Sequence, residues 1–280
     1  MKIMYLNAVG VPAYDQTFAA IAAIYKDPRI RVTVASLNPA VGAMDHLEYR
    51  VYETLVARDV MLAARQAARE GYDALALGCF YDPALDEARQ AAGGMPVIGP
   101  CQAAIETALR LGNRYSVIIG RASWQEQMHR TIRRYGFDSQ LASFRSLDLG
   151  VAEMVAGPQE TERRILAAAK QAVEQDHAEV VVLGCTLETG FHKTVQTFVG
   201  VPVIDPAIAA LKTAEHAATL RALCGWHTSQ RWGMCPPPDE ELRRFGVLQE
   251  PYLFGSRIEV PSEAGRIRQF AETTVLDQAA

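Results

Sequence analysis

The chain has 280 residues, of which 49% are hydrophobic and 21% charged, with a formal net charge of −4. This composition is typical of a globular protein with an ample core, in one large domain or two of ordinary size, and the small negative charge argues against nucleic-acid or anionic-membrane binding. Five cysteines are too few for a disulfide framework in a chain of this length, so we expect reduced thiols.

Apolar, β-branched segments alternate with alanine-rich helical patterns, which is typical of βα units around parallel sheets. Two of the predicted strands are continuous apolar runs, as expected where helices cover both faces. The predicted strands are Lys2–Asn7, Arg31–Leu37, Ala74–Gly78, Pro96–Ile98, Ser116–Gly120, Ala142–Ser146, Val180–Gly184 and Val201–Ile204. The main predicted helices are Tyr14–Tyr25, Glu53–Glu70, Ala103–Leu111, Trp124–Tyr135, Pro158–Gln175 and Pro206–Leu223.

The order of these elements repeats in the two halves of the chain. Lys2–Asn7 opens the first half and Tyr115–Gly120 opens the second. The repeat predicts an α/β fold of two pseudo-symmetric, Rossmann-like lobes with parallel sheets and an active site between them, at the carboxyl ends of the strands. We expect residues 1–98 and 206–224 to form the first lobe and 99–205 the second, because the 206–224 helix is predicted to pack back on the first lobe.

The last part of the chain, 225–280, does not continue this pattern. We expect it to form a C-terminal extension that serves as a lid, a brace or an oligomer contact, with a short helix near Ser262–Thr273. Cys224, His227 and Cys235 cluster at its start, but a fourth zinc ligand is missing and their spacing fits no standard site. We therefore predict no metal.

The most informative feature is a repeated segment that ends in a cysteine. Residues 73–79 read Asp-Ala-Leu-Ala-Leu-Gly-Cys and residues 179–185 read Glu-Val-Val-Val-Leu-Gly-Cys, and Pro-Val-Ile follows at the same offset, at 96–98 and 202–204. Each segment predicts a buried strand that delivers a thiol to its carboxyl end. A single buried cysteine often packs as a small hydrophobic residue, but two at equivalent positions indicate a functional pair.

Two facing thiols suit one kind of chemistry. Inverting a carbon next to a carbonyl takes a base on one face and an acid on the other. Cysteine fits both roles because its pKa, about 8.5 when free, drops at a helix N-terminus. The amides after each cysteine can also stabilise charge on the carbonyl oxygen. Such a pair needs no cofactor, and no phosphate-binding glycine motif is present in the sequence.

The two motifs resemble those of a known enzyme superfamily. Residues 78–83, Gly-Cys-Phe-Tyr-Asp-Pro, resemble the Gly-Cys-Phe-x-Asp-Pro segment of hydantoin racemases, which belong to the cofactor-independent aspartate/glutamate/hydantoin racemases. Residues 183–186, Leu-Gly-Cys-Thr, resemble the second motif in its amino-acid racemase form, since hydantoin racemases usually have Gly-Cys-Ala-Gly-Met there. The resemblance covers about residues 1–222. It implies that Cys79 and Cys185 are the acid/base thiols, without a cofactor, in a homo-oligomer.

The resemblance also implies a set of substrate-binding residues. Asn7 matches the asparagine that opens the family's Asn-Pro-Asn segment, although Ala-Val follows it here. Phe80 and Thr186 follow the cysteines and would offer backbone amides, and Thr186 adds a hydroxyl. Gly120 and Arg121 occupy a strand end where the family often has threonines, which leaves open which polar group is bound there.

Five further residues stand near these motifs. Leu187 and Glu188 replace the usual Gly-Met, and we include Leu187 in the substrate-binding set. Glu188 either binds a ring N–H or an amine or is a solvated helix residue, and we favour the solvated position because exposed glutamate is common. His192 is either a surface residue or tunes the second thiol. Asp82, followed by Pro83, is predicted to cap the helix after the first motif.

These observations predict a cofactor-independent racemase or epimerase for a carbon next to a carbonyl, best a 5-substituted hydantoin or a related ring. Alternatives on the same fold are an amino-acid racemase, a decarboxylase or a cis–trans isomerase of small diacids, and a non-catalytic binding protein is a further one. The second thiol weighs against a decarboxylase. No signal-peptide pattern and no long apolar window occurs, so we expect a cytoplasmic protein with a small-molecule substrate and no nucleic-acid or membrane partner.

Overall fold

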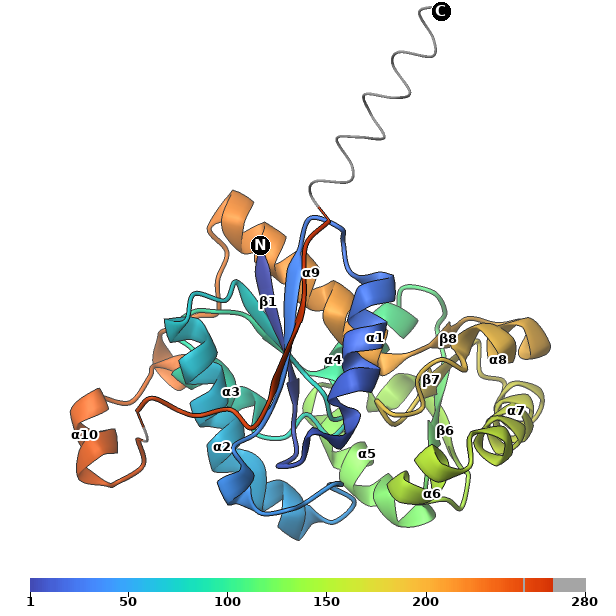
Figure 1. Ribbon diagram of the computed structural model, residues 1–280. Helices are drawn as coiled ribbons and strands as arrows, with labels where there is room; N and C mark the ends of the chain where they lie inside the picture. The colour runs from blue at the N-terminus through green and yellow to red at the C-terminus, as the bar shows by residue number, and fades with distance from the viewer. Residues whose placement is uncertain (249, 264–280) are drawn as a thin grey trace, which may run out of the picture.

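The computed structural model describes residues 1–248 and 250–263. Two separate sheets, each flanked by helices, form two lobes that lie side by side (Figure 1). This arrangement confirms the predicted α/β fold class with parallel sheets. The helix predicted near Ser262–Thr273 falls mainly on residues 264–280, which lie outside the described residues.

The two sheets share one topology. The strand order is β4-β3-β1-β2-β9 in the first sheet and β6-β5-β7-β8 in the second, so the strands β1 to β4 correspond one by one to β5 to β8. The strand β9 pairs antiparallel with β2, and the other pairings are parallel. The first sheet contains β1 (Lys2–Asn7), β2 (Arg31–Ser36), β3 (Ala74–Leu77), β4 (Val97–Ile98) and β9 (Arg257–Val260). The second contains β5 (Tyr115–Ile119), β6 (Leu141–Ser146), β7 (Val180–Leu183) and β8 (Val203–Ile204).

The helices follow the predicted pattern, with additions. A helix after each Gly-Cys strand was predicted and is present, whereas the short helix before Pro158 and the helix at 239–244 in the extension were not predicted. The helices of the first half are α1 (Asp15–Tyr25), α2 (Arg50–Arg69), α3 (Leu85–Ala91) and α4 (Pro100–Ala108). Those of the second half are α5 (Gln125–Arg134), α6 (Val151–Ala156), α7 (Pro158–Glu174), α8 (His192–Val199) and α9 (Pro206–Cys224), and the extension contains α10 (Asp239–Arg244).

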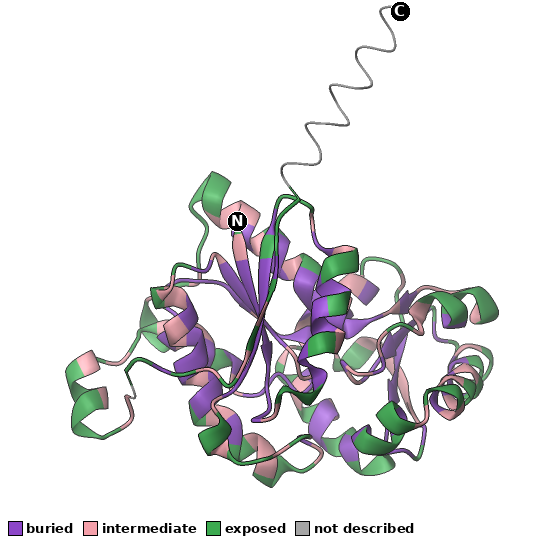
Figure 2. Cartoon of the chain, viewed as in Figure 1, coloured by how far each residue is buried: buried purple, intermediate pink, exposed green. Residues whose placement is uncertain are grey.

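The core of each lobe lies on the central strands. Every residue of β3 and β7 is fully buried, which explains why both strands are continuous apolar runs in the sequence. Figure 2 shows buried strands inside both lobes and helices that turn an exposed face outward. The helix α9 follows β8 in the chain but packs against β1, β3 and β4 of the first sheet, and also against α4. The residue ranges expected for the two lobes, 1–98 with 206–224 and 99–205, remain a prediction.

The extension returns to the first lobe instead of forming a unit of its own. Its strand β9 pairs with β2 and covers that edge of the sheet, where unpaired backbone groups would otherwise invite association. Figure 1 shows this segment crossing in front of the first sheet. Within the described part of the chain, no helix is long and apolar enough to cross a membrane.

Candidate active site

The two repeated cysteines line one pocket between the lobes. Cys79 follows β3 and Cys185 follows β7, so each thiol stands at the carboxyl end of the corresponding strand of its sheet. The pocket has a volume of about 60 Å³. Equivalent positions in the two lobes therefore bring the thiols to the same space.

Backbone packing explains the glycine before each cysteine. The N–H of Gly78 donates to the carbonyl of Leu6 at 2.8 Å, and the N–H of Gly184 donates to the carbonyl of Ile118 at 2.6 Å. A Cβ atom on Gly78 would lie 2.9 Å from the Leu6 oxygen, and one on Gly184 would lie still closer to the Ile118 oxygen. Each motif passes too close to the opening strand of its lobe for any side chain at this position.

Burial controls the ionisation of both thiols. It raises the pKa of Cys185 to about 12, and the nearby Glu188 carboxyl adds to this effect while the amides of Leu187 and Glu188 oppose it. Burial likewise raises the pKa of Cys79, assisted by Glu53 and opposed by the amide of Tyr81. The lowered pKa expected from a helix N-terminus is not found, because a loop separates each cysteine from the next helix. Loop amides, rather than a helix dipole, face the thiols.

Four residues of the predicted binding set line this pocket together with the thiols. They are Asn7, Phe80, Thr186 and Leu187. The buried Asn7 donates its amide nitrogen to Asp15 Oδ1 at 2.7 Å and to the carbonyl of Val11 at 3.1 Å. Because both contacts are acceptors, they fix the amide orientation of this pocket-lining residue, with Nδ2 toward Asp15 and Val11 and Oδ1 on the other side of the amide.

Thr186 connects the two motifs across the lobe interface. Its hydroxyl donates to the carbonyl of Gly78 at 2.8 Å, and its side chain is almost fully buried. Thr186, which follows Cys185, is thus hydrogen-bonded to Gly78, which precedes Cys79. This bond holds the two thiol-bearing loops at a fixed separation.

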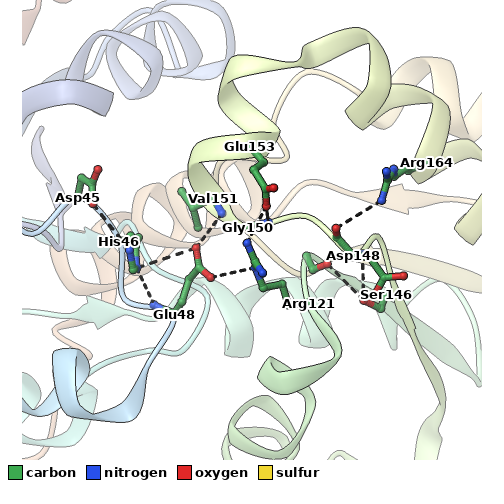
Figure 3. A network of polar contacts seen from close by, with 11 residues as sticks. Asp45, His46, Glu48, Arg121, Ser146, Asp148, Gly150, Val151, Glu153 and Arg164 are labelled. Carbon is green, nitrogen blue, oxygen red and sulfur yellow. Dashed lines mark hydrogen bonds and ion pairs between the residues drawn. The ribbon is translucent and has the colours of Figure 1, made fainter.

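Gly120 and Arg121 lie outside the lining of the thiol pocket. A Cβ on Gly120 would collide with the ring of Trp124, and that ring lines the pocket in place of the expected polar group. Arg121 pairs instead with Glu153 at 2.7 Å and with Glu48 at 3.4 Å (Figure 3). Arg121 therefore acts on the pocket through Glu48.

Glu48 is a pocket residue that the sequence analysis missed. It lies on the loop after β2, lines the pocket beside Asp45 and His46, and has a side chain only 10% exposed. Its Oε1 accepts the N–H of Val151, the first residue of α6 in the other lobe, at 2.9 Å (Figure 3). The sequence gives no local signal for this position, because the contact joins two loops from different lobes.

Glu188 is not solvated, so the favoured interpretation of this residue was wrong. Its side chain is fully buried, and Oε2 accepts the N–H of Gly184 at 3.0 Å. Within the described residues, Oε1 has no hydrogen-bond partner. Burial raises the pKa of this carboxyl well above its ordinary range. Glu188 lies behind the second thiol and outside the pocket lining.

His192 lies in a different pocket from the thiols. Its Nδ1 is 3.8 Å from Asp205 Oδ2, and both residues line a cavity of about 370 Å³ between α4, α8 and α9. Burial lowers the pKa of His192, while Asp205 opposes that shift. The residue is partly buried, which disagrees with a free surface position.

Asp82 caps a different helix from the predicted one. Its carboxylate accepts the N–H groups of Cys101 and Gln102, at 2.9 and 3.0 Å, and so caps α4. Residue Ala84, with a positive φ of 50°, precedes α3 instead. Burial raises the pKa of Asp82 to about 6, against the effect of these hydrogen bonds. The first motif is thus connected to the helix that leads into the second lobe.

A metal centre is not found in the part of the chain that the structure describes. No group of three or more histidine, cysteine, aspartate or glutamate side chains is placed to share an ion there. Cys224 and Cys235 are both exposed free thiols. Independence from a cofactor stays a prediction.

Comparison with known proteins agrees with this geometry. Residues 9–214 match the family model of Asp/Glu/hydantoin racemases. The hydantoin racemase of Paenarthrobacter aurescens is 30% identical over 242 residues, which are 86% of this chain and 99% of the relative. That of Rhizobium meliloti is 36% identical over 163 residues, 58% of this chain and 67% of the relative.

Solved structures show the same architecture. The allantoin racemase from Klebsiella pneumoniae superposes with a TM-score of 0.78 at 26% identity, over 85% of this chain and 94% of that one. The glutamate racemase from Francisella tularensis has a TM-score of 0.57 at 13% identity, over 79% and 82% of the two chains, which shows the fold alone. Fold and paired motifs define a two-lobed racemase. The chain belongs to the Asp/Glu/hydantoin racemase family, and it is an isomerase of the racemase type.

Proposed function

We propose that the protein racemises neutral ring-type carbon acids, best 5-substituted hydantoins or related rings, with Cys79 and Cys185 as the acid/base pair. The observation that carries the proposal is that both thiols line one pocket, each delivered by the corresponding strand of its lobe. A carbon atom between them would be open to proton transfer on both faces.

In the proposed mechanism one cysteine is a thiolate and the other a thiol. The thiolate removes the proton from the stereocentre, and the electron pair moves onto the adjacent carbonyl oxygen. The opposite thiol then gives its proton to the other face, so that the two residues have exchanged protonation states. Burial raises the pKa of both thiols, which makes the thiolate a stronger base once it forms. Loop amides beside the cysteines would stabilise the oxyanion.

The charges in the pocket favour a neutral substrate. Among the described residues, no lysine or arginine lines it, whereas Asp45 and Glu48 do. A diacid would bring two carboxylates toward these groups, and a free amino acid one, with no lysine or arginine among the described lining residues to receive them, which is unfavourable at short range. A ring with N–H donors would instead find acceptors in Glu48 and in Asn7 Oδ1. Hydantoin-like rings therefore suit this lining better than amino acids, malonates or maleate.

The apolar lining favours an apolar substituent on the ring. Large side chains from both lobes surround the thiols, and most of them are buried. They offer an apolar, partly aromatic surface that would exclude water from the reacting carbon. The large apolar residues of the lining are Phe18, Leu47, Phe80, Trp124, Met128 and Leu187.

Turnover of a panel of candidate substrates tests the proposal. The panel contains single enantiomers of 5-benzylhydantoin, allantoin, aspartate and glutamate, together with the achiral phenylmalonate and maleate, each in heavy water with an enzyme-free blank. We expect loss of optical rotation and deuterium uptake for the rings only. Carbon dioxide release, maleate isomerisation or faster amino-acid turnover would favour the corresponding alternative. Tight binding without turnover would favour a binding protein.

Two accompanying expectations stay predictions. A cytoplasmic location follows from the sequence patterns, and a homo-oligomeric state follows from the family resemblance. Cell fractionation tests the first, and light scattering after size-exclusion chromatography tests the second.

A further inference from the structure

We infer that Ser256, in the C-terminal extension, is a positioning residue for the pocket residue Asn7. The family match ends at residue 214, so Ser256 lies outside it. The inference rests on the proposed function, since it assigns Asn7 a contact with substrate. It is carried by a chain of hydrogen bonds that leads from the extension through Asp15 to the pocket.

The extension is anchored on the first lobe by ion pairs before it reaches the sheet. Arg65 of α2 pairs with Asp239 of α10 at 2.6 Å, and Arg69 pairs with Glu250 at 2.6 Å. Beyond these pairs, the hydroxyl of the buried Tyr252 accepts the N–H of Asn38, on the loop after β2, at 2.8 Å. These contacts bring the chain to the carboxyl end of β2.

Sheet register places Ser256 at the level of the pocket. Asn7, the last residue of β1, is the parallel partner of Ser36 at the end of β2. On the other side of β2, Ala35 is paired with Arg257 of the antiparallel strand β9. Ser256, one residue before Arg257, therefore lies beside Ser36 at the carboxyl end of β2. The hydroxyls of Ser256 and Ser36 are 3.2 Å apart.

A glycine permits this close approach. The N–H of Gly255 donates to the carbonyl of Ser36 at 3.1 Å. A Cβ atom on Gly255 would lie 2.5 Å from the carbonyl oxygen of Leu37. The absence of a side chain at 255 thus lets the extension descend onto the end of β2 and present the hydroxyl of Ser256 inward.

The hydroxyl of Ser256 holds one end of a buried carboxylate. It donates to Asp15 Oδ2, while Asp15 Oδ1 accepts the amide nitrogen of Asn7 at 2.7 Å. Asp15 is 1% exposed and Asn7 is 2% exposed, so water does not compete for these bonds. A carboxylate bound at both oxygens has one orientation, and it fixes the Asn7 amide with Oδ1 available to the pocket.

Removing the hydroxyl would leave one oxygen of a buried carboxylate without its donor. Asp15 would turn toward another donor, and the Asn7 amide would lose its fixed orientation. Substrate binding should weaken while the two thiols stay in place. If Ser256 were only a structural brace, removing its hydroxyl would lower stability and leave the kinetics of the folded enzyme unchanged.

The test compares three variants in the full-length protein. Ser256→Ala should raise KM about fivefold, the effect of losing one hydrogen bond, with kcat within about twofold of wild type. Ser256→Thr restores the hydroxyl and should return KM to the wild-type range. Glu259→Ala, the control, removes the 2.7 Å bond from Thr33 to β9 and should lower the melting temperature without changing KM.

A second measurement does not depend on the substrate. The side-chain amide signal of Asn7 in a ¹H–¹⁵N spectrum, assigned from its loss in Asn7→Ala, should move in Ser256→Ala and stay in Glu259→Ala. An unmoved Asn7 signal, or equal KM changes in both variants, would overturn the inference. Absence of wild-type turnover on every ring would count against the proposed function alone, because the amide signal would still report on Ser256.

Discussion

The hydroxyl of Thr186 donates a 2.8 Å hydrogen bond to the carbonyl of Gly78, across the interface between the lobes. Thr186 directly follows Cys185 in the sequence, and Gly78 directly precedes Cys79. This bond ties the two thiol-bearing loops to one another and so helps to set the distance between the thiols. In the proposed mechanism, that distance decides whether both faces of one carbon are reached at once.

Thr186→Val should impair both catalysis and stability. The variant keeps the shape of the side chain but leaves the carbonyl of Gly78 without its partner, at a cost of about 1–3 kcal/mol in the free energy of unfolding. We expect kcat to fall at least tenfold, since the loops that carry the thiols are no longer held together. Urea unfolding and steady-state kinetics measure the two effects. Thr186→Ser should restore both, and wild-type kcat in the valine variant would contradict the assigned role.

Glu48 should select against anionic substrates. We predict that Glu48→Gln narrows the preference for the neutral 5-(carbamoylmethyl)hydantoin over the anionic 5-(carboxymethyl)hydantoin roughly tenfold in kcat/KM. The two rings differ little in shape, so their ratio reports charge. Glu153→Gln is the matched control, because Glu153 pairs with the same Arg121 and lies outside the pocket lining. If the ratio of kcat/KM for the two rings were the same in both variants, Glu48 would have no role in substrate selection.

Activity should rise with pH in the neutral and mildly alkaline range. Burial raises the pKa of Cys185 to about 12 and raises that of Cys79 as well, so the singly ionised pair is scarce at pH 7. Its population should grow about tenfold per pH unit, and kcat/KM should follow it between pH 7 and 9. The uncatalysed rate is subtracted at each pH, and circular dichroism checks the fold. A flat profile over this range would be incompatible with two buried, protonated thiols.

Glu188 should make the protein less stable as pH rises. Burial raises the pKa of this carboxyl in the folded protein above the ordinary 4.5, so the folded state holds the proton more tightly than the unfolded state does. Its contribution to stability is complete below pH 4.5 and is lost as pH rises through the folded value.

Glu188→Gln should therefore gain stability over wild type as pH increases from 4 to 8. The amide side chain of this variant would keep the acceptor for the N–H of Gly184 and cannot ionise. Urea unfolding at each pH gives the difference, with the exposed Glu174→Gln as a control. A difference that does not change with pH would show that Glu188 is ionised alike in both states.

Local patterns in the sequence predicted the fold and the thiol pair. The glycine and cysteine at the end of β3 and of β7 are adjacent residues on a continuous apolar strand, so sequence proximity alone indicates where the thiols stand. The repeated order of elements indicated that the strands correspond. The shared topology of the two sheets confirmed that interpretation.

The remaining features depend on contacts between distant segments. Glu48 reaches the pocket from a loop whose partners, Arg121 and Val151, lie in the other lobe. Strand β9 pairs with β2 across more than half of the chain, and its four residues alternate too briefly to signal a strand. Glu188 is buried because its loop turns back under β7, which contradicts the general preference of glutamate for solvent.

Deuterium exchange by single-thiol variants is the most direct test of the central claim that Cys79 and Cys185 act on opposite faces of one carbon. Each enantiomer of 5-benzylhydantoin is incubated in heavy water with Cys79→Ala or Cys185→Ala, and exchange and inversion are followed by NMR and polarimetry. We predict that neither variant inverts the stereocentre, and that the two variants exchange the proton of opposite enantiomers. Racemisation at the wild-type rate by either variant would contradict the two-thiol mechanism.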